Sequence, residues 1–351
     1  MTGSALREVR AAAPLRADLA GGTLDLWPLG LLEDGAATVA VAVDLRVEAV
    51  AGPPRRPGLL ELRAEDLGRE RALDPGGRCR RGPLELLERT ARAVLPGTSL
   101  RLATRSPVRA GSGLGTSSAL GIAAAAACRA AAGRPPRRPP LVPLVRDLEA
   151  RVLGIPTGTQ DHEAALRGGV IVLAHRPGGA GVTRLGGPAL ALLRDSLLLV
   201  DSGRGRSSGV SNWDLFRRRV EGDPAAVRAF RRVARAGRRA AEAVAAGNLP
   251  ALGRAMREDM AARAGWSPLV LTPALAEILA AARRAGALGE KVCGAGGGGY
   301  AVILVPPGRK ERVARAVAEA GGKPSPARPT GRGLRLAARG IPGAEAGGPA
   351  P

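Results

Sequence analysis

The chain has 351 residues, a length that suits two compact domains better than one. Hydrophobic residues make up 45% of it and aromatic residues only 2%, so a folded core has to be built from Leu, Val, Ile and Ala. All but three of the 53 basic residues are arginines, spread along the chain with few aromatic side chains to stack on bases. We attribute the formal net charge of +22 to a G+C-rich coding sequence, and we expect no nucleic-acid partner.

The cysteines and the hydropathy pattern argue against three further classes: disulfide-rich proteins, zinc proteins and membrane proteins. Three cysteines without metal-ligand spacing predict neither a disulfide framework nor a zinc site, which fits a cytoplasmic location. No segment has the layout of a signal peptide or the ~20 unbroken apolar residues of a membrane span. The Ala-rich run 119–132 is too short to span a membrane and is interpreted as a buried helix. No membrane partner is expected.

Hydrophobic periodicity and turn residues predict a mixture of strands and helices. The first half, in chain order, is a strand at 37–50, a short strand pair with loops at 52–82, a helix at 83–95, a strand at 99–104, a helix at 116–132, a helix-breaking connection at 134–140, a helix at 141–153 and a strand at 169–175. The second half, after a glycine-rich stretch at 178–187, is a strand at 196–201, a long helical region at 213–247, helices at 249–264 and 273–286, a buried strand at 299–305 and a helix at 309–320. These patterns predict one domain at 1–180, a second at 190–339 and a disordered tail at 340–351.

The segment PVRAGSGLGTSSAL at 107–120 carries the strongest chemical signal. Its glycines alternate between a predicted strand and a predicted helix, where they let backbone N–H groups approach an anion closely. The following helix begins at a Thr-Ser-Ser run, so its positive dipole end faces the same anion. The alternative, a flexible linker or a plain capped helix, does not require this order. The residues predicted to bind the nucleotide are Gly111, Ser112, Gly113, Leu114, Gly115, Thr116, Ser117 and Ser118.

This segment resembles the nucleotide-binding motif of GHMP kinases, a superfamily of galactokinases, homoserine kinases, mevalonate kinases and phosphomevalonate kinases. APLRADLAGGTLD at 13–25 resembles the N-terminal motif of the superfamily, and KVCGAGGGGYAVIL at 291–304 its C-terminal glycine motif. The resemblance covers residues 13–320. It implies a two-domain α+β fold, with an N-terminal α/β domain like the second domain of a small-subunit ribosomal protein and a ferredoxin-like C-terminal domain. It also implies ATP and Mg²⁺ as cofactors.

Within the N-terminal motif, the resemblance implies that Arg16 acts in catalysis and that Gly22 and Asp25 bind the substrate. Arg16 would offset charge at the reacting hydroxyl, and Asp25 would accept hydrogen bonds from sugar hydroxyls. The run 22–24 departs from the galactokinase pattern, and the Gly-Gly pair followed by Asp25 is similar to the branch of heptose-phosphate kinases and fucokinases. Without the family match, a surface arginine and a turn aspartate remain the alternative interpretation.

Two carboxylates twelve residues apart, Glu149 and Asp161, have the spacing of the galactokinase metal ligand and catalytic aspartate. Glu149 and Ser117 would hold Mg²⁺, which prefers oxygen ligands, and Asp161 would act as general base. A solvated helix residue for Glu149 and a helix N-cap for Asp161 are the alternatives. His162 is interpreted as a substrate-pocket or structural residue and His175 as structural.

Two further segments are predicted to contact the substrate. Gly296 and Gly297 precede a buried strand, where a tight turn would touch the phosphates or the acceptor. The stretch DSGRGRSSG at 201–209 is similar to a segment of the heptose-kinase branch, so Arg204 and Arg206 are predicted to bind an anionic group on the substrate. A solvated loop is the alternative for both.

Taken together, the sequence predicts an ATP-dependent kinase that phosphorylates a hydroxyl of a sugar or sugar phosphate, with a heptose phosphate ahead of galactose or fucose. A free-sugar kinase of the galactokinase or fucokinase type is the first alternative. A non-catalytic ligand-binding or nucleic-acid-binding relative is the second.

Overall fold

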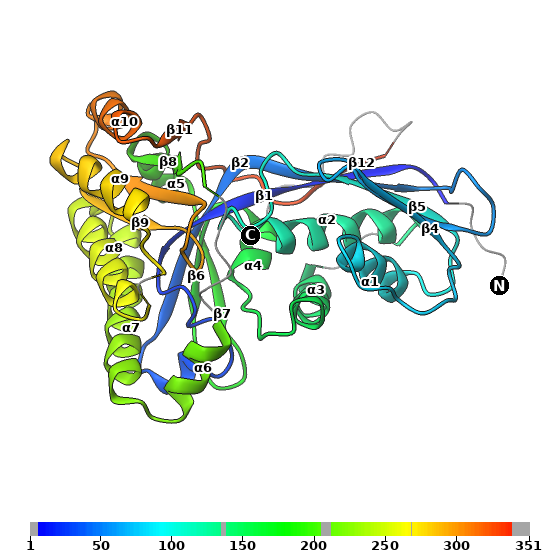
Figure 1. The fold of residues 1–351 in the computed structure, drawn as a ribbon, viewed down its shortest axis with the longest axis horizontal. Helices are drawn as coiled ribbons and strands as arrows, with labels where there is room; N and C mark the ends of the chain where they lie inside the picture. The colour runs from blue at the N-terminus through cyan, green and yellow to red at the C-terminus, as the bar shows by residue number, and fades with distance from the viewer. Residues whose placement is uncertain (1–5, 135–137, 205–211, 268, 339–351) are drawn as a thin grey trace.

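The computed structural model describes residues 6–134, 138–204, 212–267 and 269–338. Its α+β architecture consists of one long eight-stranded sheet and one four-stranded sheet, each covered by helices (Figure 1). The expected fold class is confirmed. The predicted tail at 340–351 lies outside the described residues.

The larger sheet has the order β12-β1-β2-β5-β3-β4, with β6 and β7 attached through β2. The helices α1 to α4 lie along one face of this sheet (Figure 1). The Ala-rich α2 packs most extensively on β1 and β2, because small side chains allow a close approach between helix and sheet. The elements are β1 (Val9–Ala20), β2 (Ala37–Gly52), β3 (Leu60–Ala64), β4 (Arg69–Leu73), α1 (Glu85–Val94), β5 (Leu100–Arg105), α2 (Thr116–Ala131), α3 (Arg138–Leu153), α4 (Gln160–Arg167), β6 (Val170–Ala174), β7 (Gly181–Leu185) and β12 (Arg335–Ala338), with a 3-10 turn η1 (Leu29–Leu32) after β1.

The smaller sheet has the antiparallel order β11-β8-β10-β9. The helices α8, α9 and α10 contact its strands, and α7 packs along α8 and against β2 of the larger sheet. The elements are α5 (Gly187–Ser196), β8 (Leu197–Asp201), α6 (Asn212–Val220), α7 (Pro224–Ala245), α8 (Leu249–Ala264), α9 (Pro273–Arg284), β9 (Gly289–Val292), β10 (Tyr300–Leu304), α10 (Lys310–Glu319) and β11 (Lys323–Ser325).

The strand β1 contains residues 13–20 of the N-terminal motif, and no strand was expected there. Its sequence is Ala-rich and contains Pro14, which lacks the N–H needed for a regular ladder. The register with β2 shifts between Pro14 and Leu15, so the proline sits at a bulge. Eight successive residues from 13 to 20 are buried, which removes the alternating pattern that identifies a half-exposed strand.

Three other features differ from the expected organisation. The helical region expected at 213–247 is divided into α6 and α7, because Gly222 has a φ of 79° and Asp223 caps a new helix that starts at Pro224. The chain also returns to the larger sheet at its end, where β12 pairs with β1. The segment 190–339 expected to form the second domain therefore includes a strand of the first sheet. The expected connection at 134–140 is shortened by α3, whose first residue is Arg138.

Candidate active site

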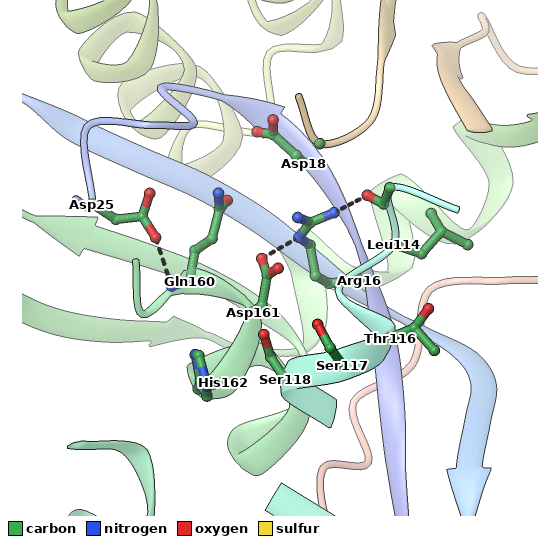
Figure 2. A network of polar contacts seen from close by, with 12 residues as sticks. Arg16, Asp18, Asp25, Leu114, Thr116, Ser117, Ser118, Gln160, Asp161 and His162 are labelled. Carbon is green, nitrogen blue, oxygen red and sulfur yellow. Dashed lines mark hydrogen bonds and ion pairs between the residues drawn. The ribbon is translucent and has the colours of Figure 1, made fainter. Parts of the chain in front are cut away.

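A cavity of about 520 Å³ lies between the glycine loop before α2, the N-terminal motif on β1 and the turn after β9. It is lined by residues of the larger sheet and its helices, by Arg263 of α8, and by Gly294 and Ala295 from the C-terminal glycine motif. Three segments far apart in sequence thus meet at one site. Figure 2 shows its polar side chains from close by.

The glycine loop has the backbone conformation that an anion site needs. Gly111, Gly113 and Gly115 have φ values of 75°, 80° and 73°, in the left-handed region that disfavours other residues. Gly115 is the N-cap residue of α2, so the free N–H groups of the first helical turn open toward the cavity. Such a helix start attracts phosphate through its amides and its dipole.

The C-terminal glycine motif packs directly on this loop. The backbone N–H of Tyr300 donates to the carbonyl of Ser112 over 2.9 Å. A Cβ atom on Gly113 would lie 2.5 Å from the carbonyl oxygen of Cys293, so only glycine allows the contact. The two motifs thereby fix each other's position.

Arg16 and Asp161 form an ion pair inside the cavity, with Nε and Oδ1 2.6 Å apart (Figure 2). Arg16 also donates to the carbonyl of Gly113, which ties it to the glycine loop. Burial lowers the pKa of Arg16, but the carboxylates of Asp161 and Asp18 raise it more, so the guanidinium stays charged. A Cβ on Gly115 would lie 3.0 Å from the Asp161 carboxyl carbon, so this carboxyl packs on the start of α2.

Glu149 reaches the same helix start from α3. Its carboxylate accepts hydrogen bonds from the hydroxyls of Ser117 and Ser118, the latter over 2.7 Å. His162 lies with Nε2 3.1 Å from Oε2 of Glu149, and both side chains are buried. Burial raises the pKa of Glu149, but the His162 imidazole 3.1 Å away and the two serine hydrogen bonds outweigh burial and lower it. The structure thus gives His162 a contact with Glu149 and does not place it among the residues that line the cavity.

Asp25 lies in the segment after β1. In Figure 2 it is on the side of Asp161 that faces away from Arg16. The backbone N–H of Gln160 donates to its Oδ2 over 3.0 Å (Figure 2). Gly158 allows this approach, because a Cβ there would lie 1.9 Å from the same oxygen. Burial raises the pKa of Asp25 to about 6, and the nearby carboxylates of Asp161 and Asp18 add to the effect.

A buried charged cluster beside the cavity was not predicted from the sequence. Lys291 is completely buried, with Nζ 3.1 Å from Oδ2 of Asp18 and 2.6 Å from Oδ2 of Asp259. Arg263 donates to Asp18 over 3.1 Å and to the carbonyl of Gly294 over 2.6 Å. These four side chains come from β1, α8 and β9, so the cluster joins the two sheets. Arginine is so frequent in this chain that no sequence signal marked Arg263.

The remaining predicted residues lie outside the cavity lining. Gly22 packs on the Asp18–Arg263 pair, and a Cβ there would lie 2.6 Å from the Asp18 carboxylate. Gly296 and Gly297 contact Val270, with the N–H of Gly297 donating to its carbonyl. Of this turn, Gly294 and Ala295 line the cavity instead. The side chain of Arg204 is exposed, and Arg206 lies outside the described residues. His175 is half-buried, and its Nε2 lies 2.9 Å from the Thr38 hydroxyl.

Two family models match the chain in the order expected for this site. Residues 83–169 match the GHMP kinases N terminal domain, and residues 240–323 match the GHMP kinases C terminal domain. The chain belongs to the GHMP kinase superfamily. The first model covers the glycine loop, Glu149 and Asp161, and the second covers Arg263 and the C-terminal glycine motif.

Individual GHMP kinases resemble the chain in a short stretch or in fold. A mevalonate kinase of Pyrococcus horikoshii is 49% identical over 67 residues, which cover 19% of this chain and 20% of that protein. The structure of Lactococcus lactis galactokinase complexed with galactose superimposes with a TM-score of 0.76 at 18% identity, covering 93% of this chain and 94% of that one. The structure of a D-glycero-D-manno-heptose 1-phosphate kinase from Bacteroides thetaiotaomicron superimposes with a TM-score of 0.72 at 23% identity, covering 93% of this chain and 98% of that one. These structural likenesses establish the shared fold.

Two further observations concern the cysteines and the helices. All three cysteines, Cys79, Cys128 and Cys293, are free thiols. In the part of the chain that the structure describes, no helix has the length and apolar character needed to cross a bilayer.

Proposed function

We propose that this chain is an ATP-dependent kinase that phosphorylates a hydroxyl group of a sugar or a sugar phosphate. The observation that carries the proposal is the position of the Asp161 carboxyl, packed on Gly115 of the glycine loop and paired with Arg16. A phosphate held at the start of α2 and a hydroxyl held at Asp161 would be neighbours in one cavity. This is the arrangement that phosphoryl transfer requires, because positioning and electrostatic stabilisation supply most of its catalysis.

In this proposal Asp161 accepts the proton of the acceptor hydroxyl as its oxygen attacks the terminal phosphate of ATP. Arg16 orients the carboxylate through the 2.6 Å ion pair and offsets negative charge at the attacking oxygen. The loop 111–115 and the first amides of α2 hold the phosphates. Leu67 and Leu86 also line the cavity, and they offer an apolar surface for the nucleotide base.

The oxygen donors at the start of α2 fit a hard cation such as Mg²⁺. Ser117 is exposed and hydrogen-bonded to Glu149, whose lowered pKa keeps it ionised. Among the described residues, no group of three or more His, Cys, Asp or Glu side chains is arranged to hold a metal. Ser117 and Glu149 would therefore share the cation with phosphate oxygens and water, and the bound cation would neutralise charge on the phosphates.

For the acceptor, we propose a heptose phosphate first, because the Gly-Gly run before Asp25 and the stretch 201–209 are similar to the heptose-kinase branch. A free sugar is the second candidate, because the Arg204 side chain is exposed and outside the cavity lining. Replacing Arg204 and Arg206 with alanine separates the two. A phosphate-binding role predicts a much larger loss with sugar phosphates than with free sugars. Equal losses would favour the free-sugar kinase.

Release of ADP with a panel of sugars, sugar phosphates and R-mevalonate tests the activity. The Asp161→Asn variant should lose about 10²–10⁴-fold in kcat, because the amide keeps the shape of the side chain and removes the base. Its affinity for a non-hydrolysable ATP analogue should stay within about twofold, since the phosphate loop is unchanged. Turnover by this variant at the wild-type rate would remove Asp161 from the mechanism. Absence of ADP release with every acceptor would refute the kinase assignment.

A further inference from the structure

The Gln160 side chain has a position that neither helix α4 nor the neighbouring Arg16–Asp161 ion pair explains. It is the first residue of α4 and precedes Asp161, and its side chain is only 8% exposed although it lines the cavity. Its Oε1 is buried and has no hydrogen-bond partner among the described residues. An unsatisfied buried acceptor costs about 1–3 kcal/mol, so a fold-stabilising role does not account for it. A ligand that completes its hydrogen bonds would.

The neighbours of Gln160 indicate which ligand groups fit. Its backbone N–H fixes Oδ2 of Asp25, and within the described residues no hydrogen bond is made by the Asp25 Oδ1. In Figure 2 the Gln160 side chain extends between Asp25 and Arg16, and all three line the same cavity. An amide offers both a donor and an acceptor, and a carboxylate offers only acceptors. Hydroxyl groups are the ligand chemistry that satisfies both at once.

The charged side chains near Gln160 and Asp25 exclude an anionic group of the ligand from the position between them. The two cationic side chains that line the cavity, Arg16 and Arg263, are each already paired with a carboxylate, Asp161 and Asp18. A carboxylate on the acceptor would therefore meet Asp25 without a free cation among the described lining residues. Like charges at contact distance repel strongly where burial limits screening by water.

We infer that Gln160 is a specificity-determining residue, whose side-chain amide binds one of two neighbouring hydroxyl groups of the acceptor while Asp25 binds the other. The acceptor is accordingly a polyhydroxylated carbohydrate and not a hydroxy acid. This inference rests on the proposed function only for the assignment of the part of the cavity around Gln160 and Asp25 to the acceptor. It concerns recognition, so it is open to a test that needs no turnover.

The test measures binding by isothermal titration calorimetry, with D-galactose, L-fucose, D-glycero-D-manno-heptose 7-phosphate and R-mevalonate as probes. At least one carbohydrate should bind the wild-type protein more tightly than R-mevalonate. Gln160→Met keeps the length of the side chain and the backbone N–H, and it should weaken that carbohydrate at least about tenfold, the effect of one lost hydrogen bond of ~1.4 kcal/mol. Monodeoxy analogues of the same sugar locate the contact, because the variant should lose nothing further with the analogue that lacks the hydroxyl bound by Gln160.

The matched control is Leu32→Met, which introduces the same side chain at an exposed position outside the cavity lining and should leave carbohydrate affinity within about twofold. Tighter binding of R-mevalonate, no binding of any carbohydrate, or equal carbohydrate affinity in Gln160→Met and wild type would each overturn the inference. Carbohydrate binding that depends on Gln160 without ADP release would overturn the proposed kinase activity alone. ADP release with a sugar that Gln160→Met leaves unchanged would overturn this inference alone.

Discussion

The buried charged cluster beside the cavity allows a sharp stability prediction for Lys291→Met. The Lys291 ammonium group is completely buried and contacts the carboxylates of Asp18 and Asp259 at 3.1 and 2.6 Å. Its removal leaves two buried carboxylates to share one cation, Arg263, which lies 3.1 Å from Asp18 and 4.0 Å from Asp259. Breaking a buried ion pair from one side costs about 3–5 kcal/mol. That is a large part of the ~5–15 kcal/mol that stabilises a typical protein.

Urea unfolding followed by tryptophan fluorescence measures the effect close to the cluster. Trp266 is buried, stacks on Phe230 and lies under the Arg263 guanidinium at 5.4 Å, whereas Trp27 and Trp213 are largely exposed. The emission change on unfolding therefore reports mainly on Trp266. We expect the free energy of unfolding of Lys291→Met to fall by about 3–5 kcal/mol.

A second variant tests the electrostatic reasoning itself. Adding Asp259→Asn to Lys291→Met removes the unpaired carboxylate and keeps an Oδ1 that accepts from the N–H of Gly21, so stability should partly return. Lys323→Met on the exposed part of β11 is the control and should change stability by less than about 0.5 kcal/mol. If Lys291→Met costs no more than the control, or if Asp259→Asn destabilises it further, the cluster is not held together by charge.

Three further predictions concern the cavity. Glu149→Gln and Ser117→Ala should each raise the Mg²⁺ concentration needed for half-maximal rate, and an unchanged Mg²⁺ dependence in both would place the metal elsewhere. The pKa of Asp25 is raised to about 6 in the folded protein, so the folded state holds the proton of this carboxyl more tightly than the unfolded state does. The free energy of unfolding therefore falls as pH rises from about 4 to 6. Asp25→Asn should therefore unfold at a higher urea concentration than wild type at pH 7 but not at pH 3.5, and a pH-independent difference would contradict this. Gly115→Ala should weaken binding of an ATP analogue at least about tenfold. The φ of 73° at this position costs alanine ~1–2 kcal/mol, and the added Cβ would press on Asp161. Unchanged affinity would contradict the assignment of this loop to the nucleotide.

Much of the site was predictable because its chemistry requires unusual residues at fixed spacing. The glycines at 111, 113 and 115 were expected to allow close backbone approach, and all three adopt left-handed φ values that other residues avoid. The expected helix over 116–132 and the buried strand over 299–305 are confirmed within two residues at each end. The superfamily and the α+β fold class are confirmed as well, although the catalytic and ligand-binding roles remain predictions.

What the sequence did not reveal depends on contacts between distant segments. The strand β1 lacks an alternating pattern because residues 13–20 are buried throughout, and its proline fits only because a bulge relieves the missing N–H. Similarly, β12 joins the first sheet across more than 300 residues of chain, which no local pattern records.

The same reason applies to single side chains. Local sequence determined that the glycine loop would be able to bind an anion, since φ and the start of α2 are properties of adjacent residues. Tertiary structure alone decided that Lys291 and Arg263 would be buried against Asp18, and that the Gln160 amide would lie at the cavity without a partner within the described residues. A charge or an amide acquires such a role only from groups that the fold brings to it, because burial and hydrogen-bond partners are set by packing and not by neighbours in sequence.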